Sequence, residues 1–278
     1  MLVSANPPPE ADFLFQGEFF QTHEVTMTNI TMSDFVITNQ DARPAKVVLS
    51  VPHDGLWAHN FTGHFTARKE GVGWADRHVT PIANDILVYC RQRGLSVDMV
   101  RFLMPRTYVD ANRPAPDMAA CTRYSETAFV DEKVRQYYEK YFTELGVCIQ
   151  RSVEEYGNEH LLVLDLHGFA RGRRHNQITD FDIILGTDHR QTIRYAEPDK
   201  LLGAYLNSGG FDTFTPLEED TLPNGDPFVG GFICEYLSGT HRVNTIQVEM
   251  EKRFRFKNSE PEGQRLARTI GQWLVETY

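Results

Sequence analysis

Short apolar runs alternate with segments of helical spacing along most of the chain. Residues 46–51 are rich in valine and stop at Pro52, and residues 160–166 form a nearly continuous apolar run, as in strands buried on both faces of a sheet. Helical spacing is clearest over residues 79–93 and 129–156, and a glycine follows each segment, which favours the end of a helix. The same criteria predict further strands at 99–104, 180–187 and 243–250, and further helices at 198–206 and 264–277.

This alternation predicts an α/β fold around a mostly parallel or mixed sheet. No linker-like composition divides the chain, so we expect residues 1–278 to form one domain. Residues 1–45 are expected to be an N-terminal extension whose phenylalanines pack on the domain or at a subunit interface, which is compatible with a homo-oligomer. The acidic stretch 217–231 is rich in proline and glycine, as lid loops often are.

Composition narrows the class of protein. The 278 residues include 28 Lys and Arg against 38 Asp and Glu, and the resulting net charge of −10 excludes a generally basic binder of nucleic acid or anionic membranes. An apolar run of about 18 residues, which a membrane span would need, is absent from the sequence. The four cysteines are scattered, and the first residues do not resemble a secretory signal. We therefore expect a reduced, cytoplasmic protein.

Three predicted strands carry potential metal ligands or catalytic groups at their C-terminal ends, the edge of an α/β sheet where ligands bind. These residues are His53, His167 and Glu249. Two histidines with one carboxylate and an open position would make a catalytic zinc site. Each histidine alone is as consistent with a polar loop residue, and Asp165 could either orient the His167 ring or cap the strand end. A competing histidine pair, His59 and His64, lacks the glutamate and the helical context of the zincin motif, which favours loop residues.

Six segments, read in order, resemble the successive motifs of N-formylglutamate amidohydrolases. Each motif is weak alone, but their order and rough spacing agree from about residue 46 to residue 256. They are LSVPHDG from Leu49, ADRHVTPI from Ala75, PRTYVDANRP from Pro105, LVLDLHG from Leu162, FVGGFICEYL from Phe228 and NTIQVEME from Asn244.

The resemblance implies a phosphorylase/hydrolase-like fold, a three-layer α/β/α sandwich with a mixed, mostly parallel sheet, related to that of zinc carboxypeptidases and aspartoacylases. It also implies one Zn²⁺ per chain, with His53 and His167 as the histidine ligands. Zinc carboxypeptidases have a glutamate where this chain has Leu56, so the carboxylate ligand is instead matched by Asp76. The alternative for Asp76 is that it caps the helix predicted from Val79.

The remaining site residues also follow from the resemblance. Asn112 and Arg113 match a dipeptide that grips a substrate carboxylate, for which an amide and a guanidinium fork are suited, although Arg113 could instead be a surface charge or a partner of Asp110. Arg106 matches an arginine that polarises the scissile carbonyl or binds a second carboxylate.

Two positions of the motifs leave alternatives open. Glu249 falls at the position of the general base, and Glu251 is the alternative if the register differs by two residues. Gly168 replaces the usual serine, and the arginines that follow, with Arg171 and Arg174 as substrate-binding candidates, either bind a second anionic group or form a solvated loop.

The implied activity is hydrolysis of the N-formyl amide of an acidic amino acid such as N-formyl-L-glutamate, which releases formate and the amino acid. Metal-activated water would attack the amide while Glu249 acts as the base. Two alternatives remain open on the same scaffold. One is a carboxypeptidase-like enzyme or a deacylase of other N-acyl amino acids, and the other is a binding protein without turnover.

Overall fold

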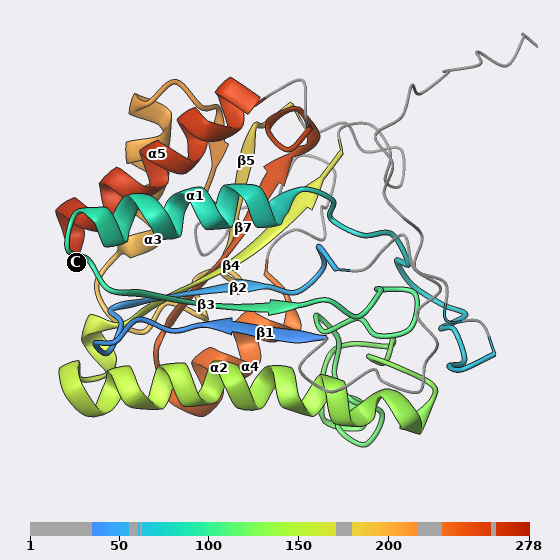
Figure 1. Ribbon diagram of the computed structural model, residues 1–278. Helices are drawn as coiled ribbons and strands as arrows, with labels where there is room; N and C mark the ends of the chain where they lie inside the picture. The colour runs from blue at the N-terminus through green and yellow to red at the C-terminus, as the bar shows by residue number, and fades with distance from the viewer. Residues whose placement is uncertain (1–34, 56–60, 62, 171–179, 216–229, 257–259) are drawn as a thin grey trace, which may run out of the picture. The chain divides into compact units, whose positions relative to one another are not determined.

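A mixed sheet of seven strands organises the computed structural model, which describes residues 35–55, 61, 63–170, 180–215, 230–256 and 260–278 (Figure 1). The strand order is β1-β3-β2-β4-β7-β5-β6, and β3, β2, β4 and β7 run parallel at its centre. β1 and β5 join this centre antiparallel, and β6 lies parallel to β5. The strands are β1 (Val36–Asn39), β2 (Val47–Val51), β3 (Val97–Phe102), β4 (Leu162–Phe169), β5 (Ile183–Gly186), β6 (Thr213–Phe214) and β7 (Asn244–Glu251).

Helices cover both faces of the sheet, so the domain has three layers (Figure 1). α1, α3 and α5 lie on one face, and α2 and α4 lie on the other. These helices are α1 (Val79–Gln92), α2 (Arg135–Tyr156), α3 (Pro198–Ser208), α4 (Phe232–His241) and α5 (Glu260–Thr277). Short 3₁₀ helices occur at η3 (Ala119–Cys121), η4 (Glu132–Val134), η5 (Asn158–His160) and η6 (Lys252–Phe254).

The alternation of side chains along the strands decides which face carries the polar residues. Leu49, Leu164 and Ile246 belong to the large apolar core shared with α1, α3 and α5. Successive side chains of a strand point to opposite faces, so His167 and Glu249, at the opposite parity, lie on the face covered by α2 and α4. Apolar residues such as Val48 and Val163 are buried on this second face too, and His167 and Glu249 add buried polar groups toward the C-terminal ends of its strands.

The predicted α/β sandwich with a mixed, mostly parallel sheet is confirmed. The predicted strands and helices all occur, with ends shifted by a few residues, except that the helix predicted over 129–156 begins only at Arg135. A 3₁₀ turn precedes it, where the Asp131 carboxylate accepts a hydrogen bond of 3.0 Å from the Lys133 backbone. The short elements β1, β6 and α4 were not predicted.

The predicted N-terminal extension (residues 1–45) and the predicted lid stretch (residues 217–231) fall largely outside the described residues. Within 1–45 the structure describes β1, which is an edge strand of the sheet itself, preceded by the buried Phe35. No helix among the described residues is long and apolar enough to cross a membrane.

Candidate metal centre and active site

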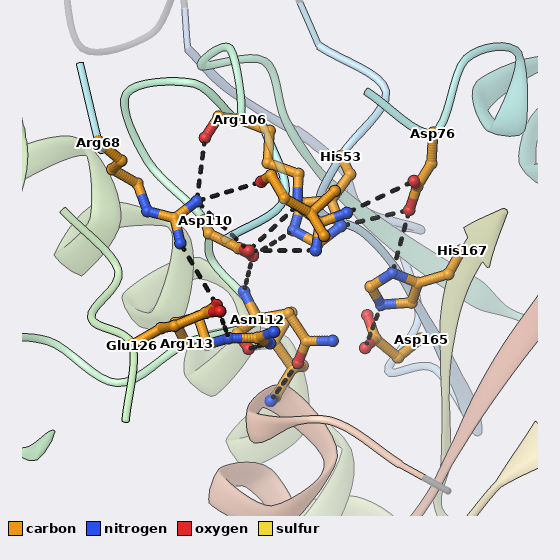
Figure 2. A network of polar contacts seen from close by, with 12 residues as sticks. His53, Arg68, Asp76, Arg106, Asp110, Asn112, Arg113, Glu126, Asp165 and His167 are labelled. Carbon is orange, nitrogen blue, oxygen red and sulfur yellow. Dashed lines mark hydrogen bonds and ion pairs between the residues drawn. The ribbon is translucent and has the colours of Figure 1, made fainter. Parts of the chain in front are cut away.

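His53 and Asp76 are brought together where the chain leaves β2. His53 follows the strand and Pro52, and its carbonyl accepts a hydrogen bond of 2.9 Å from the Asp76 backbone N–H. The first turn of α1 is capped by a different residue, Asp54, whose carboxylate accepts from the backbone N–H of His78 at 3.0 Å and of Thr80 at 2.7 Å. The alternative interpretation of Asp76 as the helix cap is therefore wrong. Its carboxylate points toward the two histidines (Figure 2).

Two imidazoles and one carboxylate meet at this corner of the sheet (Figure 2). Asp76 Oδ2 lies 3.3 Å from Nδ1 of His53 and 3.3 Å from Nδ1 of His167, which comes from the end of β4. All three side chains are buried, and their potential ligand atoms lie within 4.8 Å of one another. Nitrogen and oxygen donors in this number fit a catalytic zinc ion that keeps one open position.

The outer nitrogen of each histidine is held by a carboxylate. Nε2 of His53 lies 2.8 Å from Asp110, and Nε2 of His167 lies 2.7 Å from Asp165. A proton on Nε2 that is donated to a carboxylate leaves the lone pair of Nδ1 for a metal ion, and the carboxylate also raises the basicity of the ring. The inward nitrogens are therefore free to face a metal ion, and the donor set fits the metal that the resemblance implies.

Arginines neutralise the carboxylate behind His53. Arg106 Nε donates to Asp110 at 3.1 Å, and Arg68 Nη1 lies 3.5 Å from the same carboxylate. Burial alone would raise the pKa of Asp110, but Arg106 and His53 hold that pKa well below its usual range. Arg106 also lies 3.5 Å from Asp76 Oδ1, so the predicted catalytic arginine is paired with acids on both sides.

A buried hydrogen-bond network holds Asp165 behind His167. Ser50 Oγ donates to Asp165 Oδ1 at 2.5 Å, and the Tyr141 hydroxyl of α2 lies 2.6 Å from Ser50 Oγ. Of the two roles considered for Asp165, the structure favours orientation of the His167 ring. Ser50 and Tyr141 give no sequence signal, because their positions alone resemble ordinary core positions of a strand and a helix.

Glu249 lies directly beside His167, because the two residues are partners in the parallel register of β7 and β4. It is 6% exposed, and its Oε1 accepts a hydrogen bond of 2.9 Å from Gln247. Gln247 was not identified as a site residue from the sequence, although strand alternation places it on the same face of the sheet as Glu249. The alternative base, Glu251, accepts from the Arg253 backbone at 2.7 Å and so caps η6.

Asn112 and Arg113 line the same cavity as Glu249 and His167, and both already have protein partners. Asn112 Oδ1 accepts from the Ile233 N–H at 3.0 Å, in the first turn of α4, and its Nδ2 donates to Gln247 at 3.3 Å. Arg113 Nε donates to Glu126 at 2.9 Å and Nη1 donates to the Asn112 carbonyl at 2.8 Å. Nη2 is the remaining nitrogen of Arg113 for a ligand.

One cavity of about 240 Å³ is lined by Asp76 and His167, which together with His53 form the metal corner, and by Glu249, Asn112 and Arg113. It joins the metal corner to the Asn112–Arg113 side, and Tyr124, which the sequence did not indicate, also contributes. Its described lining comprises Asp76, Arg106, Asn112, Arg113, Tyr124, His167, Gly168, Gly230, Gly231, Gln247 and Glu249.

The other candidates from the sequence are either outside the described residues or at a distant turn. Arg171 and Arg174 lie outside the described residues, as does His59. His64 is exposed in a turn, where its backbone N–H bonds to the Phe61 carbonyl at 2.9 Å. The structure therefore brings together His53, Asp76, His167, Glu249, Arg106, Asn112 and Arg113 from the predicted set.

Comparison with known proteins agrees with the predicted family and fold. The sequence pattern described as N-formylglutamate amidohydrolase matches residues 45–254. The structure is similar to the crystal structure of N-formylglutamate amidohydrolase from Ralstonia eutropha JMP134, with a TM-score of 0.61 and 15% identity over 87% of this chain and 96% of that chain. It is also similar to a gene product from Agrobacterium tumefaciens, with a TM-score of 0.53 and 14% identity over 88% of this chain and 94% of that chain. None of the curated proteins matches the sequence.

The family match covers most of the chain and includes every segment that builds the site. It confirms the resemblance that the six motifs indicated. The chain belongs to the N-formylglutamate amidohydrolase family and is a hydrolase that acts on amides.

Proposed function

We propose that this protein is a zinc-dependent amidohydrolase that removes the formyl group from an N-formylated acidic amino acid such as N-formyl-L-glutamate. One observation carries the proposal. The inward nitrogens of two buried histidines converge with the Asp76 carboxylate, while the outer nitrogens are held by Asp110 and Asp165. This arrangement is suited to a metal ion and adjoins a small cavity that contains an acid and two arginines.

His53, Asp76 and His167 would hold the zinc ion. A zinc ion with three such ligands keeps an open position, lowers the pKa of water bound there and polarises a carbonyl group. The carboxylates behind the histidines keep both rings in the ligating tautomer. In the metal-free protein, burial alone would raise the pKa of Asp76, but hydrogen bonds from His167 and His53 and the charge of Arg106 hold that pKa well below its usual range, so Asp76 is negatively charged.

Glu249 is the general base of the proposed reaction. It accepts a proton from the attacking water and passes the proton to the nitrogen of the amino acid as the amide bond breaks. Gln247 fixes one of its oxygens at 2.9 Å and is itself held by Asn112. The Glu249 carboxylate is therefore oriented by a chain of amide hydrogen bonds that begins at Asn112. Asn112 and Arg113 form the substrate-binding side of the cavity.

The arginines supply positive charge where the substrate carries negative charge. Arg113 offers Nη2 to a substrate carboxylate, while its other nitrogens fix the plane of the guanidinium. Arg106 lies at the metal corner and favours the negative charge that develops on the carbonyl oxygen. Because the chain has a net charge of −10, these few groups must act locally.

A deacylase of larger N-acyl amino acids is the second candidate, and one observation favours it. A cavity of about 550 Å³ adjoins the site and shares Asp76 and Gly168 with it. Its lining includes the aromatic residues Trp74, Phe169 and Phe256. An apolar acyl group larger than formyl would find room there.

A substrate panel tests both candidates. The purified protein is assayed on N-formyl, N-acetyl, N-succinyl and N-benzoyl glutamate, with and without a chelator, by the release of free glutamate. We expect chelator-sensitive cleavage of the N-formyl compound, and preferential cleavage of the N-benzoyl compound would favour the second candidate. Glu249→Gln should lower kcat about 10²- to 10⁴-fold while zinc content is retained, and Glu251→Gln is the matched control. Full turnover by Glu249→Gln would contradict the proposed base.

A further inference from the structure

Arg255 is a buried cation that the proposed mechanism does not use. It follows η6 and is 7% exposed, and it forms no ion pair within the described part of the chain. A buried charge is costly unless its hydrogen-bonding capacity is met. Arg255 meets it with three backbone carbonyl groups.

The three carbonyl groups come from three distant segments. Nε donates to the Met250 carbonyl at 3.1 Å, Nη2 donates to the Phe169 carbonyl at 3.0 Å, and Nη1 donates to the Arg77 carbonyl. Each acceptor lies within two residues of a proposed site residue. Met250 follows Glu249, Arg77 follows Asp76, and Phe169 is close behind His167 in the sequence.

The backbone around the guanidinium is shaped to receive it. A Cβ atom at Gly168 would lie 2.2 Å from Arg255 Cζ and 2.3 Å from Nε, so a side chain at this position is incompatible with the observed guanidinium. Gly168 and Met250 are also register partners on β4 and β7. The guanidinium thus lies against the pair of strands that carry His167 and Glu249.

We propose that Arg255 is a positioning residue, which fixes the backbone of the three segments so that Asp76, His167 and Glu249 converge on one metal ion. A guanidinium suits this role because its donors lie in one rigid plane, whereas a lysine ammonium is a compact group on a flexible stem. Gly168 is required for this arrangement, because its lack of a side chain leaves the space that the guanidinium fills. This inference rests on the metal ligands of the proposed function.

The test compares zinc affinity, measured by chelator competition, with turnover in full-length variants. Arg255→Lys keeps the charge and loses the rigid plane of donors, so its zinc dissociation constant should rise about 10- to 100-fold and kcat should fall by a similar factor, as when partners that orient ligands are removed. KM for N-formyl-L-glutamate should change less than kcat, because Arg255 lines the larger neighbouring cavity and not the one that contains Asn112 and Arg113.

Arg91→Lys is the matched control. Arg91 also donates to backbone carbonyls, those of Val97 and Asn39, but it lies in the last turn of α1. Its loss should lower the melting temperature without changing zinc affinity or kcat. If Arg255→Lys behaves like Arg91→Lys, with zinc affinity within about threefold of the wild type, Arg255 only stabilises the fold and the proposal is overturned.

Gly168→Ala provides a second test should Arg255 variants fail to fold. The added methyl group should displace the guanidinium and weaken zinc binding about as much as Arg255→Lys does, and an unchanged zinc dissociation constant in Gly168→Ala would contradict the pairing. Where Arg255→Ala folds, Gly168→Ala should have little further effect beside it, and losses of zinc affinity that simply add would also contradict the pairing. A wild type that binds zinc but cleaves no N-acyl amino acid would refute the proposed function and still leave this inference decided by the dissociation constants.

Discussion

The metal corner and the substrate-binding side of the same cavity are built in different ways. At the metal corner, His53 and His167 are fixed by Asp110 and Asp165 through their outer nitrogens, so their inward nitrogens face Asp76. On the substrate-binding side, the Asn112 side-chain amide is hydrogen-bonded to Ile233 and Gln247. Two nitrogens of Arg113 are likewise hydrogen-bonded to protein groups.

The metal corner is therefore already organised for its ligand, whereas the substrate-binding side is not. At the metal corner, the protein contacts leave the ligating atoms turned toward one another. On the substrate-binding side, Arg113 is already paired with Glu126, which would compete with a substrate carboxylate. We therefore expect mutations at the corner to act on the metal and on turnover, and mutations at Glu126 to act on substrate affinity.

The largest effect should come from removing a histidine of the corner. His53→Ala or His167→Ala should abolish stoichiometric zinc and turnover together, because each removes one of three ligands. Zinc per chain and initial rate are measured on the same samples. His64→Ala, at an exposed turn, is the control, and a His53→Ala protein with full zinc and activity would exclude this ligand set.

Smaller losses should follow when only the orienting carboxylates are changed. Asp110→Asn and Asp165→Asn should each weaken zinc binding about 10- to 100-fold, since partners of this kind set the tautomer and basicity of the ligands. Chelator competition measures the change, with the exposed Asp117→Asn as control. Wild-type affinity in both variants would show that the hydrogen bonds behind the rings have no part in metal binding.

Protons should compete with zinc for His167. Burial alone would lower the pKa of His167, but in the metal-free protein Asp165 and Asp76 raise that pKa to about 10. Below that pH the ring must lose a proton before it can bind zinc, so affinity should rise about tenfold per pH unit between pH 6 and pH 8.5. Titrations with a pH-corrected chelator measure this slope, and a plateau across that range would contradict the raised pKa.

The smallest effect should come from Glu126→Gln on the substrate-binding side. The Arg113–Glu126 pair is only partly buried, and such pairs contribute about 0.2–1 kcal/mol. Removing the competing charge should therefore lower KM for an acidic substrate by up to about fivefold, with kcat unchanged. Steady-state kinetics measure both constants, and an increase in KM would mean that Glu126 supports Arg113 rather than competing with the substrate.

Most strands and helices were predicted from the sequence because their apolar periodicity is a local property. β1, β6 and α4 were missed because they derive their stability from the elements they pack on. α4 begins at a Gly-Gly pair and is held through Ile233 by Asn112, a contact between residues far apart in the chain. No local pattern could reveal it.

The site residues divide in the same way, into those that a local sequence pattern indicates and those that depend on contacts across the fold. His53, His167 and Glu249 were found because they follow apolar strands, and Asp76, Asn112 and Arg113 because they fall in family motifs. Asp110, Gln247 and Ser50 act through hydrogen bonds across the fold, so they were not assigned from the sequence. The sequence therefore identifies the groups that face the ligand more readily than the groups that orient them.

Reconstitution of the metal-free protein shows whether amide hydrolysis depends on one zinc ion per chain. Zinc is added in fractions of an equivalent to chelator-stripped protein, and release of glutamate from N-formyl-L-glutamate is followed at each step. We expect activity to rise linearly to about one equivalent of zinc per chain and then to stay constant, because one set of three ligands holds one ion. Full activity before zinc is added, or no activity after one equivalent is bound, would contradict a zinc-dependent amidohydrolase.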